Sequence, residues 1–201
     1  MTNALATLSP CHFATEMRAF IAVELPAEIR NGLARLQSQL AQARADLKWT
    51  EEANLHITMR FLGEITDEQR QAVEAVLQGV AAQVNAIPVQ LTGVGAFPSM
   101  ASPRVLWVGV GEGQQTLHTI AEAIERGVVS LGLPKDDHPF TAHVTLGRVR
   151  SPKNRTQLVA TVQHVTWTPP APFVATHLTL FHSTLTSSGA SYTLLAKCPF
   201  A

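Results

Sequence analysis

Cysteine is scarce in this sequence. Only two of the 201 residues are cysteine, Cys11 and Cys198, and they lie near opposite ends of the chain without the close spacing of a metal-binding pair. A disulfide framework is therefore not expected, and a reducing compartment such as the cytoplasm fits this usage. The chain also lacks any apolar run approaching the roughly 18 residues of a membrane span, and its N-terminus lacks the pattern of a secretory signal. We expect a cytoplasmic protein with no membrane partner.

An excess of either charge is missing too. Fifteen basic and fifteen acidic residues give a formal net charge of zero. This balance argues against broad electrostatic binding to long nucleic acid, although a local basic pocket remains compatible with it. The sequence has no HExxH, CxxC or DxD pattern and no Walker loop, so we expect neither a metal nor another cofactor. What the chain does have is 46% hydrophobic residues, enough to build a real core at this length.

One four-residue pattern occurs twice. Residues 56–59 (HITM) and 143–146 (HVTL) both have histidine first, threonine third and apolar residues between them. Side chains alternate between the two faces of a strand, so each histidine would share a face with its threonine. The two histidines are 143 − 56 = 87 residues apart, close to half the chain. This layout predicts two strands that present matched polar faces to one cleft.

The hydrophobic pattern predicts strands alternating with helices. Strands are expected at 18–25, 47–50, 54–61, 87–91, 104–110, 177–183 and 192–196, and at the second motif. Apolar residues at helical spacing predict one helix that opens at Pro26, one that is capped by Thr66, and one with a stripe from Leu117 to Val128. Residues 158–167 fit a helix or a strand equally well. Residues 1–16 show no clear period, so we expect a flexible N-terminal extension before a single domain at 17–201.

The order of these elements predicts the fold class. Strand, helix, motif strand and helix come first, and strand, helix, motif strand and a closing hairpin follow. This repeat indicates an α+β fold of two pseudo-symmetric lobes, each with helices outside a mainly antiparallel sheet. The two sheets would flank a central cleft.

Paired imidazoles in one cleft suit acid–base chemistry near neutral pH, because the unperturbed pKa of histidine is about 6.5. One neutral ring can take a proton from water while the other, protonated, gives one to a leaving oxygen. Thr58 and Thr145 can donate hydrogen bonds to a phosphoryl oxygen, and Arg148 can neutralise phosphate charge. Simple alternation puts Arg148 on the face opposite His143, so it must reach round or follow a bulge. Arg60, by contrast, falls by the same alternation on the face of His56 and Thr58.

The pattern leaves other readings open. A zinc site could use His56, His143 and a third ligand, either His177 or His182. A nucleotide-binding module could use the same cleft without turnover. Among the histidines outside the motif, His138 and His182 are expected nearest the cleft.

The chain resembles the two-histidine (2H) phosphoesterases, most closely the LigT-like RNA 2′,3′-cyclic phosphodiesterases of bacteria and archaea. The resemblance runs through residues 17–26, 56–63, 95–98, 103–109, 140–148 and 180–192. It implies a LigT-like fold and a phosphoric diester hydrolase that converts a terminal 2′,3′-cyclic phosphate on RNA to a 2′-phosphomonoester. It also implies that no metal takes part. His182 stands where this group more often has arginine or glutamate.

The resemblance further implies roles for individual residues. His56 would be the general acid that protonates the departing 3′ oxygen, and His143 would be the general base that activates water. Thr58, Thr145 and Arg148 would bind the phosphate. The enzyme would be a monomer, and its partner would be RNA or a nucleotide with a 2′,3′-cyclic phosphate, tRNA fragments included. The alternatives are a 2′–5′ RNA ligase or phosphodiesterase on oligonucleotides or tRNA halves, and a non-catalytic nucleotide-binding module.

Base contacts are a separate expectation. Phe20, Trp49 and Phe97 are candidate stacking platforms, although each also suits the core.

Overall fold

The computed structural model describes residues 16–187 and 189–201. The N-terminal extension expected at 1–16 therefore lies outside the described residues, apart from residue 16. The strands are β1 (Met17–Glu24), β2 (Leu47–Trp49), β3 (His56–Ile65), β4 (Ile87–Val89), β5 (Leu91–Phe97), β6 (Val105–Val110), β7 (His143–Val149), β8 (Phe173–Ala175), β9 (His177–Leu185) and β10 (Ala190–Pro199). The helices are α1 (Ala27–Leu40), α2 (Asp67–Ala81), α3 (Gln114–Ser130) and α4 (Arg155–His164), with short 3₁₀ turns η1 (Ala41–Ala43) and η2 (Glu52–Asn54).

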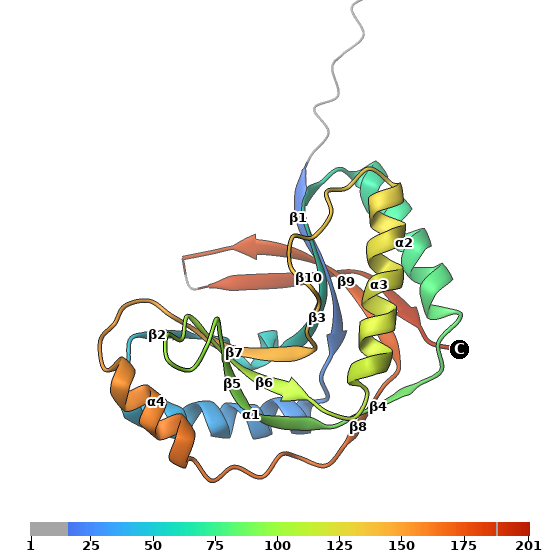
Figure 1. Cartoon of the computed structure of the whole chain (residues 1–201). Helices are drawn as coiled ribbons and strands as arrows, with labels where there is room; N and C mark the ends of the chain where they lie inside the picture. The colour runs from blue at the N-terminus through green and yellow to red at the C-terminus, as the bar shows by residue number, and fades with distance from the viewer. Residues whose placement is uncertain (1–15, 188) are drawn as a thin grey trace, which may run out of the picture.

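The main sheet consists of two halves. The first half-sheet has the order β10-β9-β1-β3, and the second has the order β7-β6-β5 with β2 beside β7 (Figure 1). Every strand pair in them is antiparallel. One residue pair between β3 and β7, Ile57 with Val144, joins the halves. The predicted two-lobed antiparallel architecture is therefore confirmed, and the two motif strands are the neighbours at its centre.

A second, two-stranded sheet pairs β4 with β8. The sequence pattern did not predict it. The strand expected at 87–91 in fact stops at Val89, and a further strand begins at Leu91 and runs to Phe97.

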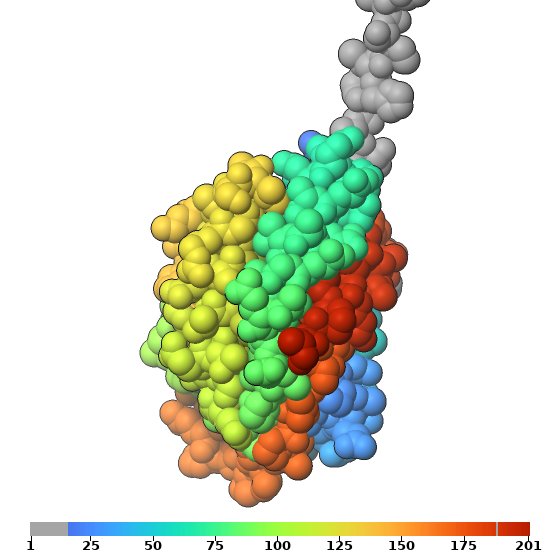
Figure 2. Space-filling model, turned by 90° about the vertical axis from the view of Figure 1, so that its right-hand side faces the viewer, coloured from blue at the N-terminus to red at the C-terminus, as the bar shows by residue number. Residues whose placement is uncertain are grey.

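The helices cover the outer faces of the half-sheets. Figure 2 shows α2 and α3 lying side by side, and both contact strands of the first half-sheet. The buried positions of α3 are the predicted stripe from Leu117 to Val128. The predicted cap of α2 is confirmed as a reciprocal pair, because Thr66 Oγ1 accepts from Gln69 N and Gln69 Oε1 accepts from Thr66 N. Apolar stripes thus fix which helix faces pack on the sheet.

The segment 158–167, which fitted either a helix or a strand, is helical as far as His164, where α4 ends. Only Leu158 of this helix is buried, which explains why its hydrophobic pattern was too weak to decide. Among the described residues, no helix combines the length and the apolarity that a membrane crossing requires.

Candidate active site

The two motif strands meet at Ile57 and Val144, which pair directly and are fully buried. Residues that flank an antiparallel pair point to the opposite face. His56 and Thr145 therefore fall side by side on that opposite face, as do Thr58 and His143. The predicted convergence of two histidine–threonine pairs is what this register produces.

Each catalytic candidate histidine is held by a backbone carbonyl two residues upstream. His56 Nδ1 lies 2.8 Å from Asn54 O, and His143 Nδ1 lies 2.7 Å from Thr141 O. A carbonyl only accepts hydrogen bonds, so Nδ1 carries the proton in both rings and Nε2 is left to exchange protons. His56 Nε2 lies 2.9 Å from the hydroxyl of Thr58, which completes the first pair.

Aromatic rings pack against both histidines. The His56 ring centroid lies 4.9 Å from that of Phe20 and 5.5 Å from that of Tyr192. The His143 ring centroid lies 5.1 Å from Phe97 and 6.2 Å from Trp107. These walls remove water from the imidazoles and make their charged forms costly.

The histidine pKa values follow from this burial. Burial lowers the pKa of His56 to about 4, with a further lowering from the charge of His143. Burial also lowers the pKa of His143, and the charge of Arg148 adds to this effect. Both rings are thus neutral at neutral pH in the ligand-free protein. A bound phosphate anion between them would favour the protonated form and raise both pKa values.

Arg148 reaches the cleft because β7 contains a bulge. On β6, Leu106 pairs with Gly147 and the next residue, Trp107, pairs with Thr145, so Leu146 has no partner of its own on β6. The extra residue shifts the alternation and returns Arg148 to the face of Thr145. Arg148 is exposed, and its charge acts to lower the pKa values of both His143 and Tyr192.

The first motif strand, β3, also contains a bulge, but this bulge turns Arg60 away from the cleft. On β1, Ala22 pairs with Thr58 and Ile21 pairs with Arg60, so Met59 is bulged. Arg60 is turned to the helix-covered face, where it forms an ion pair with Glu125 of α3. The expectation that Arg60 shares the face of the first motif is wrong for this reason.

The bulges make Phe61 the counterpart of Arg148. Each stands five residues after its histidine, since 61 − 56 and 148 − 143 both equal 5. Phe61 pairs across the sheet with Phe20, lies on the cleft side and is 53% exposed. The two half-sheets therefore differ at this position: one presents an apolar ring and the other a cation.

A buried glutamine braces the bulge of β7. Gln37 on α1 is only 8% exposed, and its Nε2 donates to Leu146 O and to Thr50 O, each at 2.8 Å. The amide of Thr50 donates to Leu146 O as well, at 2.9 Å. Two donors thus hold the carbonyl of the residue that sets the direction of Arg148.

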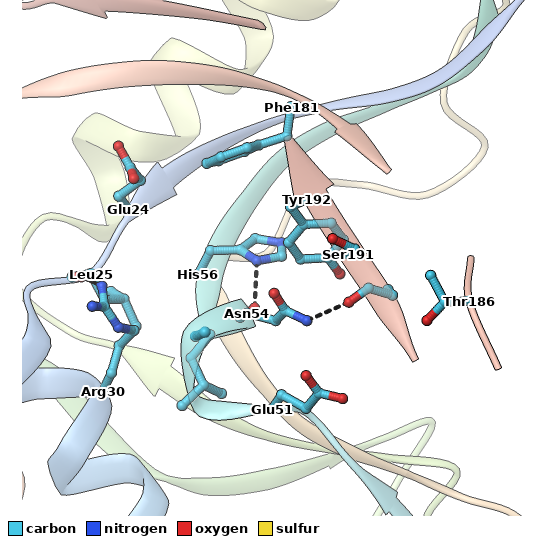
Figure 3. A pocket seen from close by; sticks show the side chains of 13 residues that line it. Glu24, Leu25, Arg30, Glu51, Asn54, His56, Phe181, Thr186, Ser191 and Tyr192 are labelled. Atoms are coloured by element: carbon cyan, nitrogen blue, oxygen red, sulfur yellow. Dashed lines mark hydrogen bonds between the residues drawn. The ribbon is translucent and has the colours of Figure 1, made fainter. Parts of the chain in front are cut away.

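A cavity of about 460 Å³ opens beside His56 (Figure 3). Phe181 and Tyr192 form one wall of it, and Glu24 and Arg30 contribute charged groups. His143 is not among the residues that line it.

Among the described residues, the other histidines do not complete a metal site with the motif. His177 Nε2 donates to Glu24 Oε2 at 2.7 Å, and His182 pairs with Ala19 on the face opposite Phe181. His138 is expected near the cleft, but its side chain is 90% exposed beside Asp136. Within residues 16–187 and 189–201, no three His, Cys, Asp or Glu side chains are grouped closely enough to hold a metal ion.

The expected stacking platforms have other positions. Phe20 is 2% exposed and packs beneath His56, and Phe97 packs edge-on against His143. Trp49 is half-buried and packs on the hydrophobic core. The sequence pattern did not single out Phe181 or Tyr192, because only the order of the strands brings them to His56.

Comparisons with known proteins agree with this arrangement. The LigT like Phosphoesterase family model matches residues 23–107 and again 108–192, one copy for each motif. The chain belongs to the LigT-like phosphoesterase family. The double match also accounts for the pseudo-symmetry of the two half-sheets.

Individual relatives extend over most of the chain. A protein of Methanothermobacter thermautotrophicus named RNA 2′,3′-cyclic phosphodiesterase is 29% identical over 89% of this chain and 96% of its own length. A protein of Aeropyrum pernix with the same name is 32% identical over 81% and 92%. The crystal structure of TT0787 of Thermus thermophilus superposes with a TM-score of 0.76 at 28% identity, over 92% of this chain and 98% of that one. E. coli LigT complexed with 3′-AMP gives a TM-score of 0.74 at 25% identity, over 92% and 99%.

Proposed function

We propose that this protein hydrolyses the 2′,3′-cyclic phosphate at the end of an RNA to a 2′-phosphomonoester, by acid–base catalysis with two histidines and without a metal. The observation that carries this proposal is the pairing of β3 with β7, which brings two histidine–threonine pairs onto one face. Both rings have Nδ1 fixed by a carbonyl, so both Nε2 atoms are available for proton transfer. The relatives named RNA 2′,3′-cyclic phosphodiesterase support the same substrate.

His143, neutral, takes a proton from water as the water oxygen bonds to phosphorus. The bond from phosphorus to the 3′ oxygen breaks, and His56, protonated, gives its proton to that oxygen. The 2′ ester remains, and the two rings exchange protonation states, which solvent then resets.

The charge of the phosphate has two roles in this scheme. Arg148 and the hydroxyls of Thr58 and Thr145 would bind the non-bridging oxygens, whose negative charge grows toward the transition state. The anion would also raise the low pKa of His56, so that this ring is protonated when substrate is present. Both histidines come from one chain, so we propose that a monomer is sufficient for activity.

The test is hydrolysis of adenosine 2′,3′-cyclic phosphate in excess chelator by the natural protein and by His56→Ala and His143→Ala. Removal of a general acid or base costs on the order of 100-fold or more in rate, so both variants should lose nearly all activity. His138→Ala, an exposed histidine, is the matched control and should retain full activity. Near-normal rates in either motif variant would contradict the proposal. Binding of the substrate without hydrolysis by the natural protein would favour the non-catalytic binding module.

A further inference from the structure

Little backbone pairing joins the two half-sheets. In the described part of the chain, a single residue pair links β3 to β7, namely Ile57 with Val144. The two motif histidines lie on these two strands, so the position of one ring relative to the other depends on whatever else holds the strands together. A second link is therefore expected near the site.

Arg60 supplies such a link from the helix-covered side of β3. Its side chain is only 10% exposed, and all three guanidinium nitrogens donate hydrogen bonds. Nε donates to Glu125 Oε2 of α3, Nη1 donates to the carbonyl of Phe61, and Nη2 donates to the carbonyl of Pro134. Pro134 lies in the segment 131–142, which leads from α3 into β7 (Figure 1). One guanidinium thus joins the first motif strand to the chain that enters the second.

The contacts of Arg60 continue along this segment. Arg60 Nη1 lies 3.6 Å from Asp136 Oδ2, and the amide of Asp136 donates to Glu125 Oε1 at 2.9 Å. Asp136 Oδ1 in turn accepts from the amide of His138 at 3.0 Å. Within the described chain, no backbone–backbone hydrogen bond involves residues 134–140. Side chains rather than backbone pairing therefore hold this stretch in place.

The segment ends at the carbonyl that orients His143. Phe140 packs on the hydrophobic core, and Thr141 follows it. The carbonyl of Thr141 lies 2.7 Å from His143 Nδ1 and accepts its proton in a hydrogen bond. The contacts of Arg60 thus act on the chain that carries this carbonyl. The ring of His56 is oriented by a different carbonyl, which lies outside the segment.

We propose that Arg60 is a positioning residue, which sets the orientation of His143 and its place relative to His56. This inference rests on the proposed function, in which His143 takes the proton from water. Arg60 itself does not touch the reacting atoms, because its side chain lies on the face of β3 opposite Thr58. Its loss should therefore slow the chemical step and leave phosphate binding by Arg148 largely intact.

Arg60→Met keeps a long side chain but removes the charge and every donor. We expect kcat for adenosine 2′,3′-cyclic phosphate to fall about tenfold or more, since a displacement of about 1 Å can cost about 100-fold in rate. KM should change little, because the groups that bind the phosphate remain. Arg70→Met is the matched control: Arg70 forms ion pairs with Asp67 and Glu74 on α2, and its loss should leave kcat unchanged. An unchanged kcat in Arg60→Met would overturn the inference.

A double variant separates positioning from stability. In Arg60→Met the carboxylate of Glu125, which is only 22% exposed, loses its cation, so this variant should unfold at a lower urea concentration. Adding Glu125→Met removes the unpaired charge and should restore much of the stability. The link to the segment stays broken, so kcat should stay low. If kcat returned together with stability, Arg60 would have only a structural role.

The tautomers of the histidines test the positioning without turnover. At neutral pH, ¹H–¹⁵N NMR of the natural protein should show the proton on Nδ1 in both motif rings. In Arg60→Met, His143 should become a mixture of two tautomers, while His56 stays unchanged as an internal control. If the natural protein hydrolyses no cyclic phosphate but His143 responds in this way, the proposed function fails and the link from Arg60 stands. An unchanged tautomer of His143 in Arg60→Met would contradict the link itself.

Discussion

The side-chain amide of Gln37 donates a 2.8 Å hydrogen bond to the backbone carbonyl of Leu146, a residue 109 positions away in the chain. Leu146 is the bulged residue of β7, and the bulge directs Arg148 into the cleft. This contact joins a buried position on α1 to the bulge that directs Arg148, the residue proposed to bind the phosphate.

Gln37→Met keeps the length of the side chain but cannot donate. We expect kcat/KM for the cyclic substrate to fall about tenfold, because one hydrogen bond that braces the bulge is lost. If Gln37 acts through Arg148, the double variant with Arg148→Ala should be no slower than Arg148→Ala alone. Gln39→Met, an exposed position on the same helix, should have no effect. Losses that multiply in the double variant would show that Gln37 acts by another route.

The low pKa of His56 predicts how stability depends on pH. The pKa is about 4 in the folded protein and about 6.5 when unfolded, so the unfolded chain binds more protons between these values. The free energy of unfolding should therefore fall as pH falls from about 6.5 to about 4, by at most about 3 kcal/mol from this group. Above pH 6.5 the contribution of His56 does not change.

Urea unfolding at pH 7 and at pH 4.5 measures this effect. His56→Gln should lose less stability between the two pH values than the natural protein does, because the variant has no group to protonate. His138→Gln, at an exposed position, should behave like the natural protein. Equal losses in all three proteins would mean that His56 is not held neutral by burial.

The acid and base roles predict different responses to the leaving group. A p-nitrophenyl phosphodiester releases an anion that needs no proton, so loss of the general acid should matter less with this substrate. With this substrate, the rate loss caused by His56→Ala should be at least about tenfold smaller than with the cyclic substrate. The rate loss caused by His143→Ala should be the same with both substrates. Recovery by His143→Ala instead would reverse the two roles.

The sequence predicts which residues share a face along a regular strand, but not where a neighbouring strand introduces a bulge. The spacing of His56 and His143 predicted the two lobes and the shared polar face, because a strand alternates with a period of two. The faces of Arg60 and Arg148 could not be predicted in this way, since each follows a bulge that only pairing with a neighbouring strand reveals. Alternation counted along one strand gives the wrong face for every residue that follows a bulge.

The cavity beside His56 is a second feature that the sequence could not predict. Glu24, His56 and Tyr192 line it together, although long stretches of chain separate them. Their proximity comes from the order of β10, β9, β1 and β3 in the sheet. The periodicity of a single segment carries no information about strand order, so the cavity could not be predicted from the sequence.

The most direct test of the central claim is the identity of the product. Adenosine 2′,3′-cyclic phosphate would be incubated with the protein in excess chelator and the product identified by ³¹P NMR. If His56 donates its proton to the 3′ oxygen, adenosine 2′-phosphate should be the only product. Adenosine 3′-phosphate, or a mixture of the two, would contradict the proposal that His56 gives its proton to a departing 3′ oxygen.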